Sequence, residues 1–292
     1  MKKAKYLLGV ATLGAMTFLA ACGNEGSDSS ASDKDLGDIN LAYVEWDTEI
    51  ASTHVVAQVL EDIGYDVSVT PLDNAIMWEA VSKGEADAMV AGWLPGTHAA
   101  QFEKYGDSLV DLGPNLEGAK IGLVVPAYMD VNSIEDLNSE AGAVITGIEP
   151  GAGIMSATET ALDTYPNLAE WSLLPSSSGA MTVALDQAIK NEEEIIVTGW
   201  SPHWKFASYD LKYLEDPKGV YGGDENIHTF VREKLETEAP EAYKVLDAFH
   251  WTPEDIEEIM LEINAGASPK EAAANWIKGN EELVNEWKSA IE

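Results

Sequence analysis

The fold is decided by residues 39–91, which read INLAYVEWDTEIASTHVVAQVLEDIGYDVSVTPLDNAIMWEAVSKGEADAMVA. Three short apolar runs in this stretch predict strands. Two stretches between them have apolar residues at helical spacing and are each followed by glycine, which predicts helices. The expected order is strand 39–44, helix 50–63, strand 65–70, helix 74–82 and strand 86–91. Strands that alternate with helices in this way predict a parallel sheet with helices on its faces.

The rest of the chain continues in the same style. Strands are predicted at 122–126, 143–148 and 195–198, with helices over 154–163 and 180–191. From residue 226 onward the pattern predicts mainly helices, over 226–238, 241–249, 253–264, 269–278 and 281–291. The fold class expected from these patterns is α/β.

A weak internal repeat divides the predicted elements into two similar halves. Residues 92–95 read GWLP and residues 199–202 read GWSP, and each motif follows a predicted strand. Ligands collect at the carboxyl ends of strands in open α/β sheets. About 250 residues also suit two lobes better than one. We therefore expect a two-lobed clamp whose tryptophan-bearing loops face each other across a cleft.

The first residues have the pattern of an export signal. A lysine-rich start is followed by an uncharged run over 6–21, which is short for a membrane span and typical of a signal peptide. The run ends in LAACG, which resembles the lipobox of bacterial lipoproteins, so residues 1–21 are predicted to be removed and Cys22 to carry lipid. Residues 22–38 are nearly free of apolar side chains and are expected to be a flexible linker. The expected location is the outer face of the cytoplasmic membrane.

Composition excludes several classes of protein. The 292 residues carry 17 Lys and Arg against 51 Asp and Glu, a formal charge of −34, so phosphate-backbone binding to nucleic acid is not expected. Cys22 is the only cysteine, which rules out an internal disulfide or a zinc ribbon. The acidic surface is expected to keep the protein soluble and monomeric.

Tryptophan is unusually common, with nine residues against five phenylalanines. Trp46, Trp93 and Trp200 lie at junctions that follow predicted strands, where binding residues collect. Three converging indoles would make a box suited to a quaternary ammonium, which cannot donate hydrogen bonds. Sugar stacking is the main rival, but these loops carry few polar side chains. The other tryptophans lie in or beside predicted helices and are mostly assigned to packing: Trp78, Trp171, Trp204, Trp251, Trp276 and Trp287.

A second motif could hold an anion. Residues 150–155 read PGAGIM and open a predicted helix without an acidic side chain, so backbone N–H groups are free to bind an anion. The helix of the first half starts with DTE at 47–49, and those side chains are expected to satisfy its own N–H groups. His98 could donate to a carboxylate, and His203 is a weaker candidate. A zwitterion has less need of an arginine beside its carboxylate than a free carboxylic acid has, and Arg232 is the only arginine.

With these motifs the chain resembles the glycine betaine-binding proteins of osmoprotectant ABC transporters, and it is most similar to the lipoprotein receptors of Gram-positive bacteria. The resemblance covers nearly all of the folded part and rests on residues 46–47, 92–98, 147–154, 200–204 and 209–214. It implies a type II periplasmic-binding fold. The site that it implies consists of a Trp46, Trp93 and Trp200 box around the trimethylammonium group, with the carboxylate held by the N–H groups of Gly153 and Ile154 and by His98.

The resemblance also implies how the lobes are arranged and used. Lobe 1 is expected at 39–122 and 222–292, and lobe 2 at 123–221. Because each lobe supplies part of the site, ligand would favour the closed state. The expected partners are glycine betaine or a related betaine and a separate permease with its ATPase subunit. No catalytic residue, metal or cofactor is expected.

Other ligands and other classes of protein are compatible with the same residues. Carnitine and proline betaine compete with glycine betaine, while choline lacks a carboxylate and would leave the Gly153 and Ile154 groups without a ligand. A cleft glycosidase could use the carboxylates of Glu45, Asp47 and Glu149, although no nucleophile–base pair is visible. A structural or adhesive lipoprotein is a third class.

Overall fold

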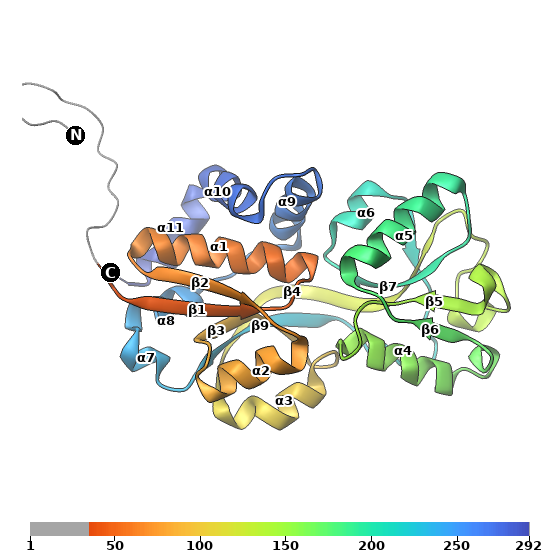
Figure 1. Ribbon diagram of the computed structural model, residues 1–292, viewed down its shortest axis with the longest axis horizontal. Helices are drawn as coiled ribbons and strands as arrows, with labels where there is room; N and C mark the ends of the chain where they lie inside the picture. Colours follow the sequence, from red (N-terminus) through yellow and green to blue (C-terminus); the bar gives the residue numbers. More distant parts are fainter. Residues whose placement is uncertain (1–34, 292) are drawn as a thin grey trace, which may run out of the picture. The chain divides into compact units, whose positions relative to one another are not determined.

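The computed structural model describes residues 35–291. The predicted signal segment 1–21, the predicted lipid site Cys22 and most of the predicted linker lie outside the described residues. The described part is an α/β fold in which one hydrogen-bonded sheet carries helices on both faces (Figure 1). The predicted α/β class is confirmed.

The sheet consists of nine strands within the described residues. Their bounds are β1 (Asp38–Tyr43), β2 (Asp66–Pro71), β3 (Ala88–Leu94), β4 (Leu109–Pro126), β5 (Val144–Thr146), β6 (Ser172–Leu174), β7 (Ile196–Ser201), β8 (Leu211–Tyr213) and β9 (Glu225–Arg232).

Helices cover both faces of the sheet. The α-helices are α1 (Asp47–Ile63), α2 (Asn74–Lys83), α3 (Ala99–Tyr105), α4 (Gly153–Thr164), α5 (Ser178–Asn191), α6 (Trp204–Ser208), α7 (Leu235–Glu238), α8 (Pro240–Ala248), α9 (Pro253–Asn264), α10 (Pro269–Gly279) and α11 (Glu281–Ser289). Short 3₁₀ turns occur at η1 (Gly106–Ser108), η2 (Ile134–Asp136), η3 (Glu140–Ala143) and η4 (Pro166–Leu168).

The long strand β4 joins two strand groups, which are β2, β1, β3 and β9 on one side and β7, β5 and β6 on the other. The order across the sheet is β2-β1-β3-β9-β4-β7-β5-β6, and β8 also pairs with β4. Residues 109–119 of β4 run antiparallel to β9, whereas residues 120–124 run antiparallel to β7. One strand therefore belongs to both groups, and the helices of each group pack around its own half of the sheet (Figure 1).

The opening stretch folds as its pattern predicts. Strand β1 runs parallel to both β2 and β3, with α1 and α2 as the connections. Helix α1 ends at Gly64, whose left-handed φ of 115° lets its N–H reach the carbonyl of Glu61. This is the backbone conformation that glycine adopts most easily. Because β1 and β3 are parallel, their carboxyl ends lie at the same edge of the sheet.

The prediction of a helix over 226–238 is wrong. Residues Glu225–Arg232 form β9, which lies between β3 and β4 and pairs antiparallel with both. Only Leu235–Glu238 is helical. The pairing partners of β9 are more than 100 residues away in the sequence for β4 and more than 130 for β3, so a local reading of the segment could not reveal them.

The folded part begins slightly earlier than predicted. The N–H of Leu36 donates to the carbonyl of Gly64, and Asp38 is already paired in β1 with Asp66. None of the helices in residues 35–291 combines the length and the hydropathy of a membrane span.

Candidate functional site

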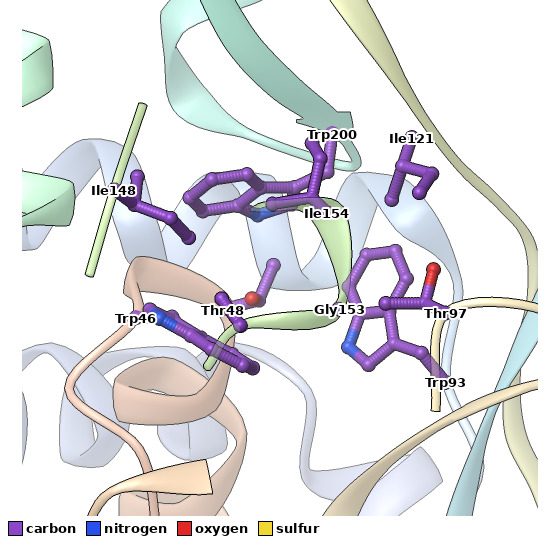
Figure 2. Close-up of a pocket in the computed structure, with 10 residues that line it drawn as sticks. Trp46, Thr48, Trp93, Thr97, Ile121, Ile148, Gly153, Ile154 and Trp200 are labelled. Atoms are coloured by element: carbon purple, nitrogen blue, oxygen red, sulfur yellow. The ribbon is translucent and has the colours of Figure 1, made fainter. Parts of the chain in front are cut away.

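A pocket lies where the two strand groups meet. Its walls are formed by Trp46, Thr48, Trp93, Thr97, Ile121, Ile148, Ala152, Gly153, Ile154 and Trp200, and its space including the mouth is about 310 Å³. Figure 2 shows the three indoles arranged around this one space. None of these wall residues carries a charged side chain.

Two of the three tryptophans, Trp93 and Trp200, lie at the carboxyl ends of strands, as the repeat predicts, and Trp46 lies between β1 and α1. Trp46 is the residue before α1, and Trp93 and Trp200 lie in the last two residues of β3 and β7. The two strand positions are thus within the strands and not just after them. All three side chains are at most 6% exposed, so the pocket walls are largely removed from water. A cation that entered would lose its water and gain contact with ring faces.

Two carboxylates bond two of the three indoles of this pocket, those of Trp46 and Trp93. The Nε1–H of Trp46 donates to the Glu149 carboxylate on the other strand group. The Nε1–H of Trp93 donates to Oε1 of Glu49 at 2.8 Å. These bonds orient the rings, because a buried indole N–H seeks an acceptor.

The acidic start of α1 bonds both its own helix and the pocket wall. The residue before α1, Trp46, makes no side-chain cap bond, and the Glu49 carboxylate bonds its own backbone N–H, which agrees in part with the expectation that residues 47–49 satisfy the N–H groups of this helix. Glu49 is 1% exposed and also accepts from Oγ1 of Thr48 at 2.5 Å. Burial raises the pKa of Glu49 to about 7, against the hydrogen bonds from Thr48 and Trp93, and the charge of Asp47 adds to the rise.

Asp47 links α1 to the other strand group. Its carboxylate accepts from Trp204 Nε1 at 2.8 Å and from Ser178 Oγ at 2.9 Å, and His203 Nε2 lies 3.4 Å away. Burial alone would raise the pKa of Asp47, but the contacts with His203, Trp204 and Ser178 outweigh it and hold the pKa well below its usual value. Asp47 therefore stays ionised and ties the start of α1 to α5 and α6.

The start of α4 approaches the opposite wall of the pocket closely. A Cβ placed on Gly153 would lie 2.1 Å from the carbonyl oxygen of Thr97. Thr97 is itself held by the buried Glu225 carboxylate, which accepts from the N–H groups of Gly96 at 2.7 Å and Thr97 at 2.6 Å. Only glycine fits at residue 153 in this arrangement.

The first turn of α4 provides the predicted bare N–H groups. It has no side-chain cap and no acidic side chain, and both Gly153 and Ile154 line the pocket. Unsatisfied N–H groups at a helix start attract an anion. The structure thus brings the three indoles and the predicted anion-binding N–H groups of Gly153 and Ile154 to one pocket.

His98 lies behind the wall of the pocket. Its ring is fully buried and stacks on Trp46 with centroids 6.0 Å apart, and its Nδ1 accepts from the backbone N–H of Trp93 at 3.0 Å. Burial lowers the pKa of His98 to about 3, so the ring is neutral. In this position it supports two of the indoles, and its role as a donor to a carboxylate stays a prediction.

Lys205 packs against the third indole. Its Nζ lies 4.2 Å from the ring centroid of Trp200, and the side chain is fully buried without lining the pocket. Burial lowers the pKa of Lys205 to about 7. His203 contacts the same indole edge-on at 4.8 Å and accepts from the N–H of Lys205.

The remaining tryptophans are buried, as expected for packing residues. Trp251, Trp276 and Trp287 form one aromatic cluster together with Phe249. Trp204 has a further task, because it donates to Asp47.

Sequence reasoning missed three groups that shape the pocket: Glu49, Glu225 and Lys205. The sequence pattern indicates Glu49 only as part of a helix start, because its spacing from Trp93 carries no local signal. The bulky TFV run at 229–231 and the alternation before it were available as signs of β9, which places Glu225 beneath the Thr97 turn.

Comparison with known proteins places the chain in a family. Residues 37–279 match the model described as the substrate-binding domain of ABC-type glycine betaine transport systems. The chain therefore belongs to that family, which is a family of transport proteins and not a class of enzymes.

Individual relatives agree with this assignment. A glycine betaine/carnitine transport binding protein, GbuC, of Listeria monocytogenes serotype 1/2a is 50% identical over 159 residues, which is 54% of this chain and 53% of GbuC. The aligned part thus spans about half the length of that relative. The crystal structure of lactococcal OpuAC, closed and complexed with glycine betaine, is 57% identical with a TM-score of 0.84 and covers 86% of this chain and 99% of that one. A choline-binding protein in complex with choline is 28% identical with a TM-score of 0.80 and covers 86% and 91%.

Proposed function

We propose that this protein captures glycine betaine, or a closely related quaternary-ammonium zwitterion, and delivers it to an ABC transporter. The observation that carries the proposal is that three indole faces and the bare start of α4 line one pocket without a charged side chain. Trp46, Trp93 and Trp200 would surround the trimethylammonium group, and the N–H groups of Gly153 and Ile154 would hold the carboxylate.

The energetics favour a zwitterion over other small molecules. A desolvated cation–π contact contributes about 2 kcal/mol, so three rings can offset the loss of hydration of one quaternary ammonium. A sugar needs several polar side chains on the wall, and Thr48 and Thr97 are the polar wall residues here. A bare carboxylic acid would meet no cationic side chain on the wall.

We propose that the two strand groups act as lobes that close on the ligand, with lobe 1 at 39–122 and 222–292 and lobe 2 at 123–221. Support comes from contacts that join the proposed lobes: Trp46 to Glu149, Asp47 to Ser178 and Trp204, and Asn74 to the carbonyl of Gly151 at 3.3 Å. Ligand that contacts both lobes shifts the equilibrium toward the closed state.

The cellular setting is part of the same proposal. The mature protein would be tethered by lipid on Cys22 to the outer face of the cytoplasmic membrane, act as a monomer without enzymatic activity, and meet a separate permease with its ATPase subunit. Mass spectrometry of the membrane fraction, before and after a Cys22→Ser substitution, tests the anchor. Loss of the lipid adduct and release of the protein are expected.

A titration with four ligands tests the proposed function. Glycine betaine, proline betaine, carnitine and choline are added separately while tryptophan fluorescence and heat are recorded. Because the N–H groups of Gly153 and Ile154 are expected to bind a carboxylate, the three zwitterions should bind and choline, which has none, should bind more weakly. Failure of all three zwitterions to bind, or tighter binding of choline than of every zwitterion, would contradict the proposal. Preference for carnitine would identify the ligand without changing the mechanism.

A further inference from the structure

Glu49 lies directly behind the pocket. Its carboxylate is 1% exposed and bonds two wall residues, Trp93 through Nε1 at 2.8 Å and Thr48 through Oγ1 at 2.5 Å, without lining the pocket itself. Burial of a charged carboxylate costs folding free energy unless the group has hydrogen-bond or ionic partners. Both donors are neutral, so neither compensates the negative charge.

We propose that Glu49 is a positioning residue that also provides the negative charge faced by a bound quaternary ammonium, so that ligand affinity depends on its ionisation. The inference rests on the proposed function. An ionised Glu49 orients the Trp93 ring through the bond from its Nε1–H. The carboxylate also polarises this N–H bond, which increases the electron density on the face of the ring. In surroundings of low polarity the charge also attracts the ammonium across the ring.

Ionisation of Glu49 then couples to binding. Because burial raises its pKa to about 7, the carboxyl group is only partly ionised at neutral pH. A cation bound nearby favours the ionised form and lowers that pKa. Binding therefore releases protons near pH 7, and affinity rises as pH rises through this range. If the cation lowers the pKa by about one unit, affinity changes about tenfold between the protonated and ionised forms.

The neighbouring ionisable groups do not share this behaviour, with one exception. Asp47 on α1 stays ionised because its pKa is well below its usual value, and His98 after β3 and His203 before α6 stay neutral because burial lowers their pKa values to about 3 and about 4. Lys205 is the exception, because its pKa is lowered to about 7 and its Nζ faces Trp200.

Charged groups on the other elements packed against α1 lie elsewhere. His54 on α1 bonds its own helix through the carbonyl of Ile50 and contacts Tyr43 of β1 edge-on. Lys270 of α10 and Lys288 of α11 pair with Glu61 and Asp62 near the carboxyl end of α1. Glu257 of α9 differs from these, because its carboxylate bonds the backbone of His203, which contacts Asp47, and burial raises its pKa.

Calorimetry with glycine betaine, over pH 5.5 to 8.5 in buffers of different ionisation enthalpy, tests the proposal. For the unmodified protein we expect about tenfold tighter binding at the upper end and proton release near pH 7. Glu49→Gln keeps acceptor and donor groups for Trp93 and Thr48 but removes the charge. It is expected to bind about tenfold more weakly at high pH and to lose both the pH dependence and the proton release.

Lys205→Met is the matched control. Lys205 also loses its positive charge as pH rises through about 7, and the loss of this charge behind Trp200 would by itself strengthen binding at high pH. The inference expects Lys205→Met to keep the pH dependence. Loss of that dependence in Lys205→Met, or its persistence in Glu49→Gln, would overturn the role of Glu49 while leaving betaine capture intact. If Glu49→Gln does not fold, the unmodified protein still decides: pH-independent affinity without proton release overturns the inference. Absence of betaine binding at every pH would overturn the proposed function as well.

Discussion

Replacing Gly153 by alanine should block closure of the pocket without harming the fold. A Cβ at this position would lie 2.1 Å from the Thr97 carbonyl oxygen, 2.6 Å from its Cγ2 and 2.9 Å from its carbonyl carbon. Because ordinary contacts begin well above 3 Å, the two segments must separate by about 1 Å or more. Thr97 cannot yield easily, since Glu225 holds its N–H and hydroxyl groups.

The magnitude follows from the cost of overpacking. Forcing extra atoms into a packed contact costs about 1–3 kcal/mol. If that cost falls on the closed state, glycine betaine should bind about 5- to 150-fold more weakly. Helix α4 should not suffer, because residue 153 already has helical backbone and alanine is a better helix former than glycine.

Two measurements separate loss of closure from loss of fold. Calorimetry gives the affinity, and small-angle scattering with and without ligand reports compaction, while thermal unfolding checks stability. Gly179→Ala is the matched control, because this glycine also lies near a helix start and a Cβ there would meet nothing within 4 Å. Wild-type affinity and normal compaction of Gly153→Ala would refute the reasoning, and so would a comparable loss of affinity in Gly179→Ala.

Three further predictions concern the pocket and its supports. Alanine in place of Trp46, Trp93 or Trp200 should each weaken betaine binding by about 2 kcal/mol, roughly 30-fold, with normal circular dichroism; unchanged calorimetric affinity in all three would contradict the cage. Asp47→Asn should weaken ligand binding by about 1.5–3 kcal/mol, because the charge-assisted bonds that join α1 to α5 and α6 are lost; equal affinity in a side-by-side titration would show that this link does not contribute to closure. Because the pKa of His98 is about 3 when folded against 6.5 unfolded, the unfolded chain binds more protons between these values, so the free energy of unfolding should fall as pH drops from about 6.5 toward 3. Denaturant unfolding at several pH values should show a smaller fall for His98→Gln than for the unmodified protein, and equal falls would count against a buried neutral ring.

Much of the fold could be predicted from local patterns. The order of strands and helices over 39–91 follows from apolar periodicity and from glycines that end α1 and α2, because these signals act within a few residues. Likewise, the helices α9 and α10 are marked by Thr252 and Ser268 with an acidic residue three positions later, and both form the capping box. These helices and strands could be predicted from the sequence because the groups that start and end them lie within a few residues of their partners.

The sequence by itself predicted the parts of the proposed site but not how they are supported. Trp46, Trp93, Trp200 and the bare start of α4 could be selected because they lie at or after the carboxyl ends of predicted strands, and parallel strands end at one edge. The tertiary structure alone decided that the strand at residues 225–232 lies between β3 and β4, and that Glu49 and Glu225 hold pocket residues. Those groups are joined to their partners across 44 and about 130 residues, and no short-range pattern encodes a contact between segments that distant.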